Sequence, residues 1–182
     1  MKLNIKDILR PSLILTVICL AVAAVMVLTN MLTADKISEA RQIKAEEARK
    51  IVLTAAESFE DSGDYYIGKK DGNVVGYVFE TETKGYGGTV QVMTGIDAGG
   101  RIGGVVILTH EETPGLGANA ENEAFRDQYR QNIPQGGLQV VKNKAASDGT
   151  VEAMTGATIT SRAVTDAVNK AAEMYRTIEG VS

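Results

Sequence analysis

The sequence predicts an α+β protein in which one N-terminal transmembrane helix precedes a single small domain. Three observations lead to this prediction. Residues 12–32 carry no charged side chain, the middle of the chain reads as strands joined by glycine turns, and residues 160–178 repeat apolar side chains at helical spacing. Strands that follow one another, with helices at the ends, are typical of the α+β class. A chain of 182 residues has room for one span and one ordinary domain.

The uncharged segment is long enough to cross a bilayer. As a helix it would reach roughly 32 Å, which matches the hydrocarbon core of a membrane. A cleaved signal peptide is the alternative, but such apolar regions are shorter and residues 32–35 are a poor cleavage site. A lipoprotein anchor at Cys19 would need a small residue before it, where the chain has Ile18. We therefore expect an uncleaved anchor, in which Cys19 is an apolar side chain facing lipid or another helix.

The charges beside the anchor predict its orientation. Lys2, Lys6 and Arg10 precede the segment against the single acid Asp7. Basic residues before a first span keep the N-terminus in the cytoplasm, so the domain is expected on the outer face of the cell membrane. The net charge of −4 and the absence of a basic cluster farther along argue against nucleic-acid binding.

Periodicity then divides the rest of the chain. We expect a cytoplasmic N-terminus and anchor over residues 1–33, an amphipathic helix over 34–60 that ends near Phe59, and an extracytoplasmic domain over 61–182. Two hairpins are expected in the domain, the first turning at residues 71–73 and the second at 99–101. A helix over 119–132 and a strand over 138–142 should follow. The last helix is expected to begin at Thr160 or Ser161, either of which could cap it.

The residue counts exclude several kinds of chemistry. One cysteine permits neither an internal disulfide nor an iron–sulfur cluster or zinc finger built from this chain alone. One histidine leaves little scope for a conventional catalytic triad. The adjacent acids Glu111 and Glu112 have no partner histidine or further carboxylate cluster, so no metal site is predicted.

Three glycine-containing loops remain as candidates for function: a first loop at residues 84–88, a second at 110–117 and a third at 152–161. The third loop leads into the last helix. Free backbone N–H groups and the positive end of the dipole favour a phosphate at such a place, and Gly156 and Ala157 would let a bulky group approach. Thr158 adds a hydroxyl. No Walker or dinucleotide-binding pattern is present, so the residues alone indicate only a phosphate-bearing ligand near Thr158.

The motifs in these loops resemble a known family. The sequence Glu152-x-x-Thr155-Gly156-Ala157-Thr158 resembles the flavinylation signature of FMN-binding domains, in which Asp or Glu can hold the first place. The segments at 112–117 and 85–88 match two further segments of that family in the same order. With the anchor, the resemblance covers essentially the whole chain and is to the G subunits of the Rnf complex, the ion-translocating ferredoxin:NAD⁺ oxidoreductase.

The resemblance implies an electron-transfer subunit that carries covalent FMN, joined through its phosphate to the Thr158 hydroxyl. A flavin transferase would install the group, with Glu152 and Thr155 as parts of the sequence that it recognises. The third loop would hold FMN through Thr155, Gly156 and Ala157 as well as Thr158. The second loop would lie against the isoalloxazine, and its expected contributors are Glu112, Thr113, Gly115, Leu116 and Gly117. No catalytic residue of its own is expected in this chain.

The expected partners are a lipid bilayer and the membrane and iron–sulfur subunits of an Rnf-type complex, with no complete activity in this chain alone. Two further residues each have two interpretations. His110 could hydrogen-bond the flavin or have a structural role. Tyr86 could stack on a ring, but we expect it to pack on the domain at the end of a strand. Other functions stay open at this point. They are the C subunit of the Na⁺-translocating NADH:quinone oxidoreductase, a tethered FMN-binding sensory or adaptor domain, and a purely structural module without flavin.

Overall fold

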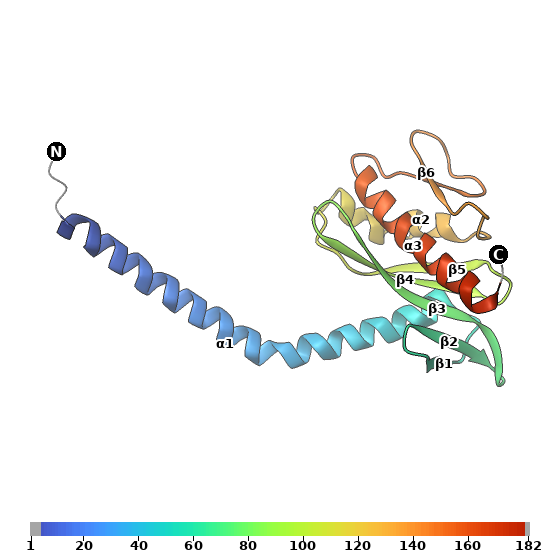
Figure 1. The fold of residues 1–182 in the computed structure, drawn as a ribbon, viewed down its shortest axis with the longest axis horizontal. Coiled ribbons are helices and arrows are strands. Elements are labelled where there is room, and N and C mark those ends of the chain that lie inside the picture. Colours follow the sequence, from blue (N-terminus) through green and yellow to red (C-terminus); the bar gives the residue numbers. More distant parts are fainter. Residues whose placement is uncertain (1–4, 181–182) are drawn as a thin grey trace. The chain divides into compact units, whose positions relative to one another are not determined.

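The computed structural model describes residues 5–180, and the chain forms two compact units, Met1–Ile43 and Lys44–Ser182. Helix α1, Ile5–Val52, begins in the first unit and ends in the second (Figure 1). Among the described residues, Leu9–Val52 of this helix is the one helical segment that is long and apolar enough to cross a membrane. Its most apolar window has a mean hydropathy of 2.7, and none of that window is buried. This agrees with the predicted anchor.

The helix does not reach Phe59 as expected, and the following compact unit begins well before residue 61. The helix ends at Val52, and the next residue, Leu53, is buried with 3% of its surface exposed. Ala56 N–H then closes a turn on Leu53 O at 3.1 Å. Residues 58–60, which were expected to be helical, instead belong to the edge strand β1, Ser58–Asp61.

Five antiparallel strands follow one another in a meander, in the order β1-β2-β3-β4-β5. The strands after β1 are β2, Tyr65–Lys70; β3, Asn73–Lys84; β4, Thr89–Asp97; and β5, Ile102–Thr109. Both predicted hairpins are present. Asp71 and Gly72 join β2 to β3 with φ values of 49° and 79°, the signs that a two-residue type I′ turn requires.

The two faces of the sheet bury different clusters. On one face, α3, Thr158–Glu179, packs through Val164, Ala167 and Val168, which are all fully buried (Figure 1). On the other face, Ala48 and Val52 from the last turns of α1 and Leu53 just after the helix form a second cluster with strand residues. Glycine makes this second contact close, since a Cβ at Gly104 would lie 3.1 Å from Val52 Cα.

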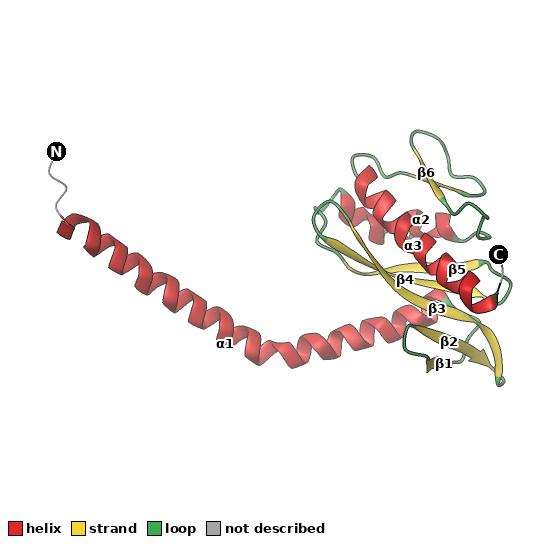
Figure 2. Ribbon diagram, viewed as in Figure 1, coloured by secondary structure: helices red, strands yellow, loops and turns green. Residues whose placement is uncertain are grey.

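The predicted helix over 119–132 is wrong. Three short turns replace it: η1, Gly117–Glu121; α2, Glu123–Arg126; and η2, Asp127–Tyr129. Asn122 interrupts the helix because its ψ of 136° is extended. The expected strand near 138–142 is β6, Gln139–Val141, which pairs in parallel with an unexpected partner, β7, Thr150–Glu152. Loops flank this small ribbon (Figure 2).

The start of the last helix also differs from the prediction. Helix α3 begins at Thr158, so Thr160 and Ser161 lie in its first turn and neither is the N-cap. The N-cap is Ala157, whose carbonyl accepts the N–H of Ser161 at 2.9 Å. The C-terminal end follows the usual rule, because Gly180 takes a left-handed φ of 66°. Because the helix starts earlier than expected, the Thr158 hydroxyl lies on the helix itself.

Candidate functional site

The three loops meet within the second unit and line an open cavity of about 410 Å³, hereafter the three-loop cavity. This volume lies in the range of small-molecule sites. Its lining residues are Tyr86 from the first loop, Glu112, Thr113, Leu116 and Gly117 from the second, and Gly156, Ala157, Thr158, Ile159 and Thr160 from the third loop and α3. The fold therefore brings together segments that lie as far as 74 residues apart, between Tyr86 and Thr160.

The first turn of α3 lies on the lining of this cavity and has backbone N–H groups without an intrahelical partner. Ala157 makes no side-chain capping bond, and the first intrahelical bond comes from Ser161 N–H. The N–H groups of Thr158, Ile159 and Thr160 therefore precede the helical hydrogen-bond ladder, as the first N–H groups of any helix do. Together with the positive end of the helix dipole, they form a place suited to a phosphate.

Ser161 closes the third loop behind these donors. Its Oγ accepts the N–H of Met154 at 3.0 Å and donates to Ala157 O at 3.0 Å. The loop then reaches α3 through Gly156, whose φ of 76° is unfavourable for a residue with a side chain. A Cβ at Gly156 would lie 3.2 Å from Leu116 Cδ2, so the glycine also keeps the cavity open between the second and third loops.

Glu112 connects all three loops from its buried position. Its Oε1 accepts the N–H of Tyr86 at 2.7 Å and the N–H of Gly87 at 3.2 Å. Its Oε2 accepts the Thr160 hydroxyl at 2.7 Å. The residue is only 7% exposed, and these bonds occupy the carboxylate that sequence reasoning assigned to flavin contact. Thr160 is accordingly a donor to Glu112 and not a helix cap.

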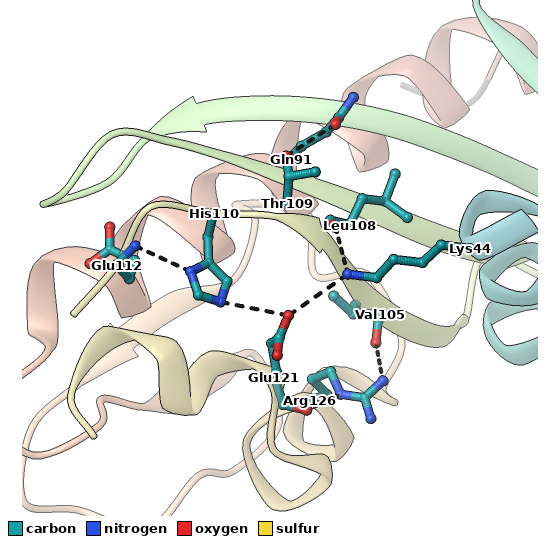
Figure 3. Close-up of polar contacts among 9 residues, drawn as sticks. All are labelled: Lys44, Gln91, Val105, Leu108, Thr109, His110, Glu112, Glu121 and Arg126. Carbon is teal, nitrogen blue, oxygen red and sulfur yellow. Dashed lines mark hydrogen bonds and ion pairs between the residues drawn. The ribbon is translucent and has the colours of Figure 1, made fainter. Parts of the chain in front are cut away.

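A second set of polar contacts supports the second loop from behind (Figure 3). His110 Nδ1 accepts the N–H of Glu112 at 3.1 Å, and its Nε2 lies 3.6 Å from Glu121 Oε1. Lys44 Nζ approaches the same carboxylate oxygen at 3.8 Å and donates to Leu108 O at 2.6 Å. His110 does not line the three-loop cavity, so its role here is to hold the backbone of Glu112.

Most of the predicted cofactor-binding residues line the three-loop cavity, and some do not. Thr155 and Gly115 lie in the expected loops but are exposed and outside the lining. Glu152, the proposed transferase-recognition acid, is exposed at the end of β7, and its N–H donates to Gln128 Oε1 at 2.7 Å. Glu111 is exposed beside Gly88, whereas its neighbour Glu112 is buried.

Two members of the site were not among the predicted cofactor-binding residues. Tyr86 was expected to pack on the domain but is 73% exposed and lines the cavity. Ile159 was not singled out, and it is 54% exposed on the first turn of α3. The position of Tyr86 between glycines could have indicated its place in the site, because small neighbours let its backbone N–H approach the Glu112 carboxylate. Nothing local marked Ile159, because its exposure depends on where α3 begins.

The fold and the cavity agree with the class of protein that a family match gives: residues 85–173 match the FMN-binding domain family. Residues 1–50 match a second family, the RnfG N-terminal region. The chain is 37% identical over 195 residues to the G subunit of the Na⁺-translocating ferredoxin:NAD⁺ oxidoreductase complex of Acetobacterium woodii, covering 95% of this chain and 94% of that protein. The chain belongs to the family of G subunits of these ion-translocating oxidoreductase complexes.

Other relatives agree with this assignment. The chain is 37% identical over 172 residues to the G subunit of the proton-translocating ferredoxin:NAD⁺ oxidoreductase complex of Clostridium ljungdahlii, covering 91% of this chain and 90% of that protein. Among solved structures, NqrC of Shewanella oneidensis superposes with a TM-score of 0.51 at 22% identity, covering 66% of this chain and 65% of that one. This last likeness concerns the fold.

The residues of the three-loop cavity fit an FMN group. The free N–H groups at the start of α3 suit its phosphate, and the Thr158 hydroxyl lies on the same turn. Tyr86, Leu116 and Ile159 offer the apolar surface that an isoalloxazine requires, and all three are exposed enough to meet it. Gly156 keeps the space between phosphate site and apolar surface clear, since a side chain there would meet Leu116.

Proposed function

We propose that this chain relays electrons in a membrane-bound Rnf-type complex through FMN bound covalently to Thr158. The observation that carries the proposal is the position of Thr158 at the first turn of α3, among unpaired N–H groups and on the lining of the three-loop cavity. A flavin accepts and passes electrons one or two at a time, while the protein sets its potential and position. The chain alone would have no complete activity.

The attachment requires a flavin transferase that uses FAD. The Thr158 oxygen would displace AMP from the FMN phosphate of FAD, losing its proton and forming a phosphoester to the protein. The exposed Glu152 and Thr155 would be read by the transferase, because exposed side chains outside the cavity lining are free for an enzyme to contact. The remaining partners would be the membrane and iron–sulfur subunits of the complex.

The proposed location is the outer face of the cell membrane, with α1 as the anchor and the N-terminus in the cytoplasm. The apolar helix and the three basic residues that precede its uncharged segment support this orientation. Covalent attachment suits such a place, because a flavin that dissociates outside the cytoplasm is not readily replaced. Protease added to sealed cells should cut near Lys142; protection of this exposed loop would contradict the orientation.

Co-expression with a flavin transferase tests the attachment. The wild-type chain should give a fluorescent band on a denaturing gel and a mass increased by one FMN less one water. Thr158→Val should abolish both, because no oxygen remains to bind the phosphate. Thr177→Val, on the exposed end of the same helix, is the matched control and should keep the flavin.

An unmodified wild-type chain, produced beside a transferase shown to be active on another acceptor, would contradict the covalent linkage. A modified Thr158→Val chain would place the bond at another residue.

A further inference from the structure

The carboxylate of Glu112 occupies a pocket built to hold it. Glycines on two sides make room, since a Cβ at Gly117 would lie 2.9 Å from Glu112 Cβ and one at Gly85 would lie 3.3 Å from Glu112 Cδ. His110 fixes the backbone from the opposite side by accepting the Glu112 N–H (Figure 3). The side chain is thus held at a single place at the junction of the three loops.

The carboxylate of this buried residue is the acceptor in all three of its hydrogen bonds. Two of its three partners are backbone N–H groups, of Tyr86 and Gly87, which can only donate. The third partner, the Thr160 hydroxyl, lies 2.7 Å from the other oxygen. Both carboxylate oxygens therefore accept hydrogen bonds, one from the first loop and one from α3.

The charge has no cationic partner close by. Among the described residues, no Lys, Arg or His side chain forms an ion pair with Glu112. The lining of the three-loop cavity likewise contains no Lys or Arg, and Glu112 is its one acidic side chain. At hydrogen-bond distance the carboxylate therefore meets only the N–H and O–H dipoles of its three partners. A low-dielectric surrounding makes such a charge felt over longer distances.

We propose that Glu112 is a positioning residue that also lowers the reduction potential of the flavin. Its carboxylate clasps the three loops around the three-loop cavity and places a fixed negative charge in the lining. Reduction adds electrons, and hence negative charge, to the flavin, so a neighbouring fixed carboxylate opposes it. This inference rests on the proposed function, because it concerns FMN bound in that cavity.

Two substitutions test the charge with opposite expected signs. In Glu112→Gln the amide oxygen can still accept the N–H groups of Tyr86 and Gly87, but the negative charge is gone. The midpoint potential of the bound FMN should shift to more positive values. In Thr160→Val the charge remains and loses the hydroxyl that partly balances it, so the midpoint potential should shift to more negative values. Thr160→Ser keeps a hydroxyl at this position and should therefore keep the wild-type potential.

The measurement is a redox titration of the full-length, FMN-loaded chain in detergent, followed by flavin absorbance. Glu111→Gln is the matched control, because it removes the same charge from the adjacent, exposed residue. Its potential should change less than that of Glu112→Gln. A purely structural role for Glu112 would move the potentials of Glu112→Gln and Thr160→Val in the same direction, and that result would overturn the proposal, as would equal shifts in Glu112→Gln and Glu111→Gln.

Two further outcomes are also decisive. If Glu112→Gln does not fold, Thr160→Val decides: a more negative potential supports the proposal, and an unchanged or more positive one overturns it. If the wild-type chain takes up no covalent FMN, the proposed function fails, and the effect on the potential falls with it. Whether Glu112 holds the three loops together is then tested separately in the flavin-free chain. Hydrogen exchange at the Tyr86 and Gly87 amides should be slow in wild type and faster in Glu112→Ala; equal rates would contradict the clasp.

Discussion

Leu116 shows how one side chain of the second loop joins the site. It is 46% exposed, lines the three-loop cavity and lies where a Cβ on Gly156 would meet it. An exposed leucine is ordinary on a protein surface. Here, however, Tyr86 and Ile159 are exposed around the same cavity. Three such residues around one cavity point to an apolar ligand surface.

Leu116→Asp should therefore alter the flavin without preventing its attachment. The new carboxylate would place a polar, charged group where the isoalloxazine is expected, while Thr158 and the start of α3 stay unchanged. The absorbance spectrum or the midpoint potential of the bound FMN should shift, and the denaturing gel should still show a fluorescent band.

Val74→Asp is the matched control for Leu116→Asp, because Val74 is 43% exposed on β3 and does not line the cavity. If Leu116→Asp leaves both the spectrum and the potential at the values of Val74→Asp, Leu116 does not contact the ring.

Single residues differ in how far the sequence could predict them. Thr158 could be predicted because its motif is local and resembles a flavinylation signature. The bonds of Glu112 could not, since its partners lie 26 and 48 residues away in the chain. Periodicity carries no information on which distant N–H group meets a buried carboxylate.

At the scale of elements, a hydrogen bond between two side chains joins the end of α3 to β3. The Tyr77 hydroxyl donates to Glu179 Oε1 at 2.6 Å. This bond and, to a lesser degree, burial raise the pKa of Tyr77 from 10.0 to about 12. The neutral phenol is thus favoured in the folded state. Its contribution to stability is complete below pH 10 and is lost as the pH rises toward about 12.

Glu179→Gln should lower the pKa of Tyr77 back toward 10.0, because the charged acceptor is removed. Ultraviolet absorbance of the phenolates during an alkaline titration measures this, and Tyr77→Phe identifies the signal among the six tyrosines. Glu173→Gln, an exposed acid on the same helix, should leave the titration unchanged. A Tyr77 pKa that stayed near 12 in Glu179→Gln would contradict this role for the carboxylate.

Elements with local signals were predicted, and those without were not. The hairpin at residues 71 and 72 is specified by its own turn residues, which accept positive φ. The start of α3 was misplaced because Thr160 and Ser161 are good caps, but Glu112 and Met154 bind their hydroxyls in the fold. The predicted helix over 119–132 was wrong because the backbone of Asn122 is extended. The spacing of apolar residues does not indicate this interruption.

For the whole molecule, the last turns of α1 belong to the FMN-binding unit. Lys44 is the first residue of that unit, and Ala48, Val52 and Leu53 are buried against the sheet. Burying a Val or Leu side chain contributes about 1.5–3 kcal/mol, so Val52 and Leu53 together would contribute about 3–6 kcal/mol. This is a large part of the total stability of an ordinary domain, about 5–15 kcal/mol.

A chain that begins at Lys44 should therefore fold, whereas one that begins at Asp61, the boundary expected from composition, should unfold at lower denaturant or fail to fold. The shorter chain loses the buried end of α1 and the edge strand β1. Chemical denaturation followed by circular dichroism compares the two. Equal unfolding midpoints would show that α1 adds nothing to the stability of the domain.

The sequence by itself determined the anchor, the two hairpins, the face of the last helix and the threonine expected to carry the flavin. Each depends on residues close together in the chain: an uncharged run, a glycine turn, a helical repeat or a short motif. Only the tertiary structure decided which residues share the three-loop cavity, where α3 begins and how the end of α1 joins the core. These follow from contacts between distant segments, and above all from a buried carboxylate that needs donors from more than one loop.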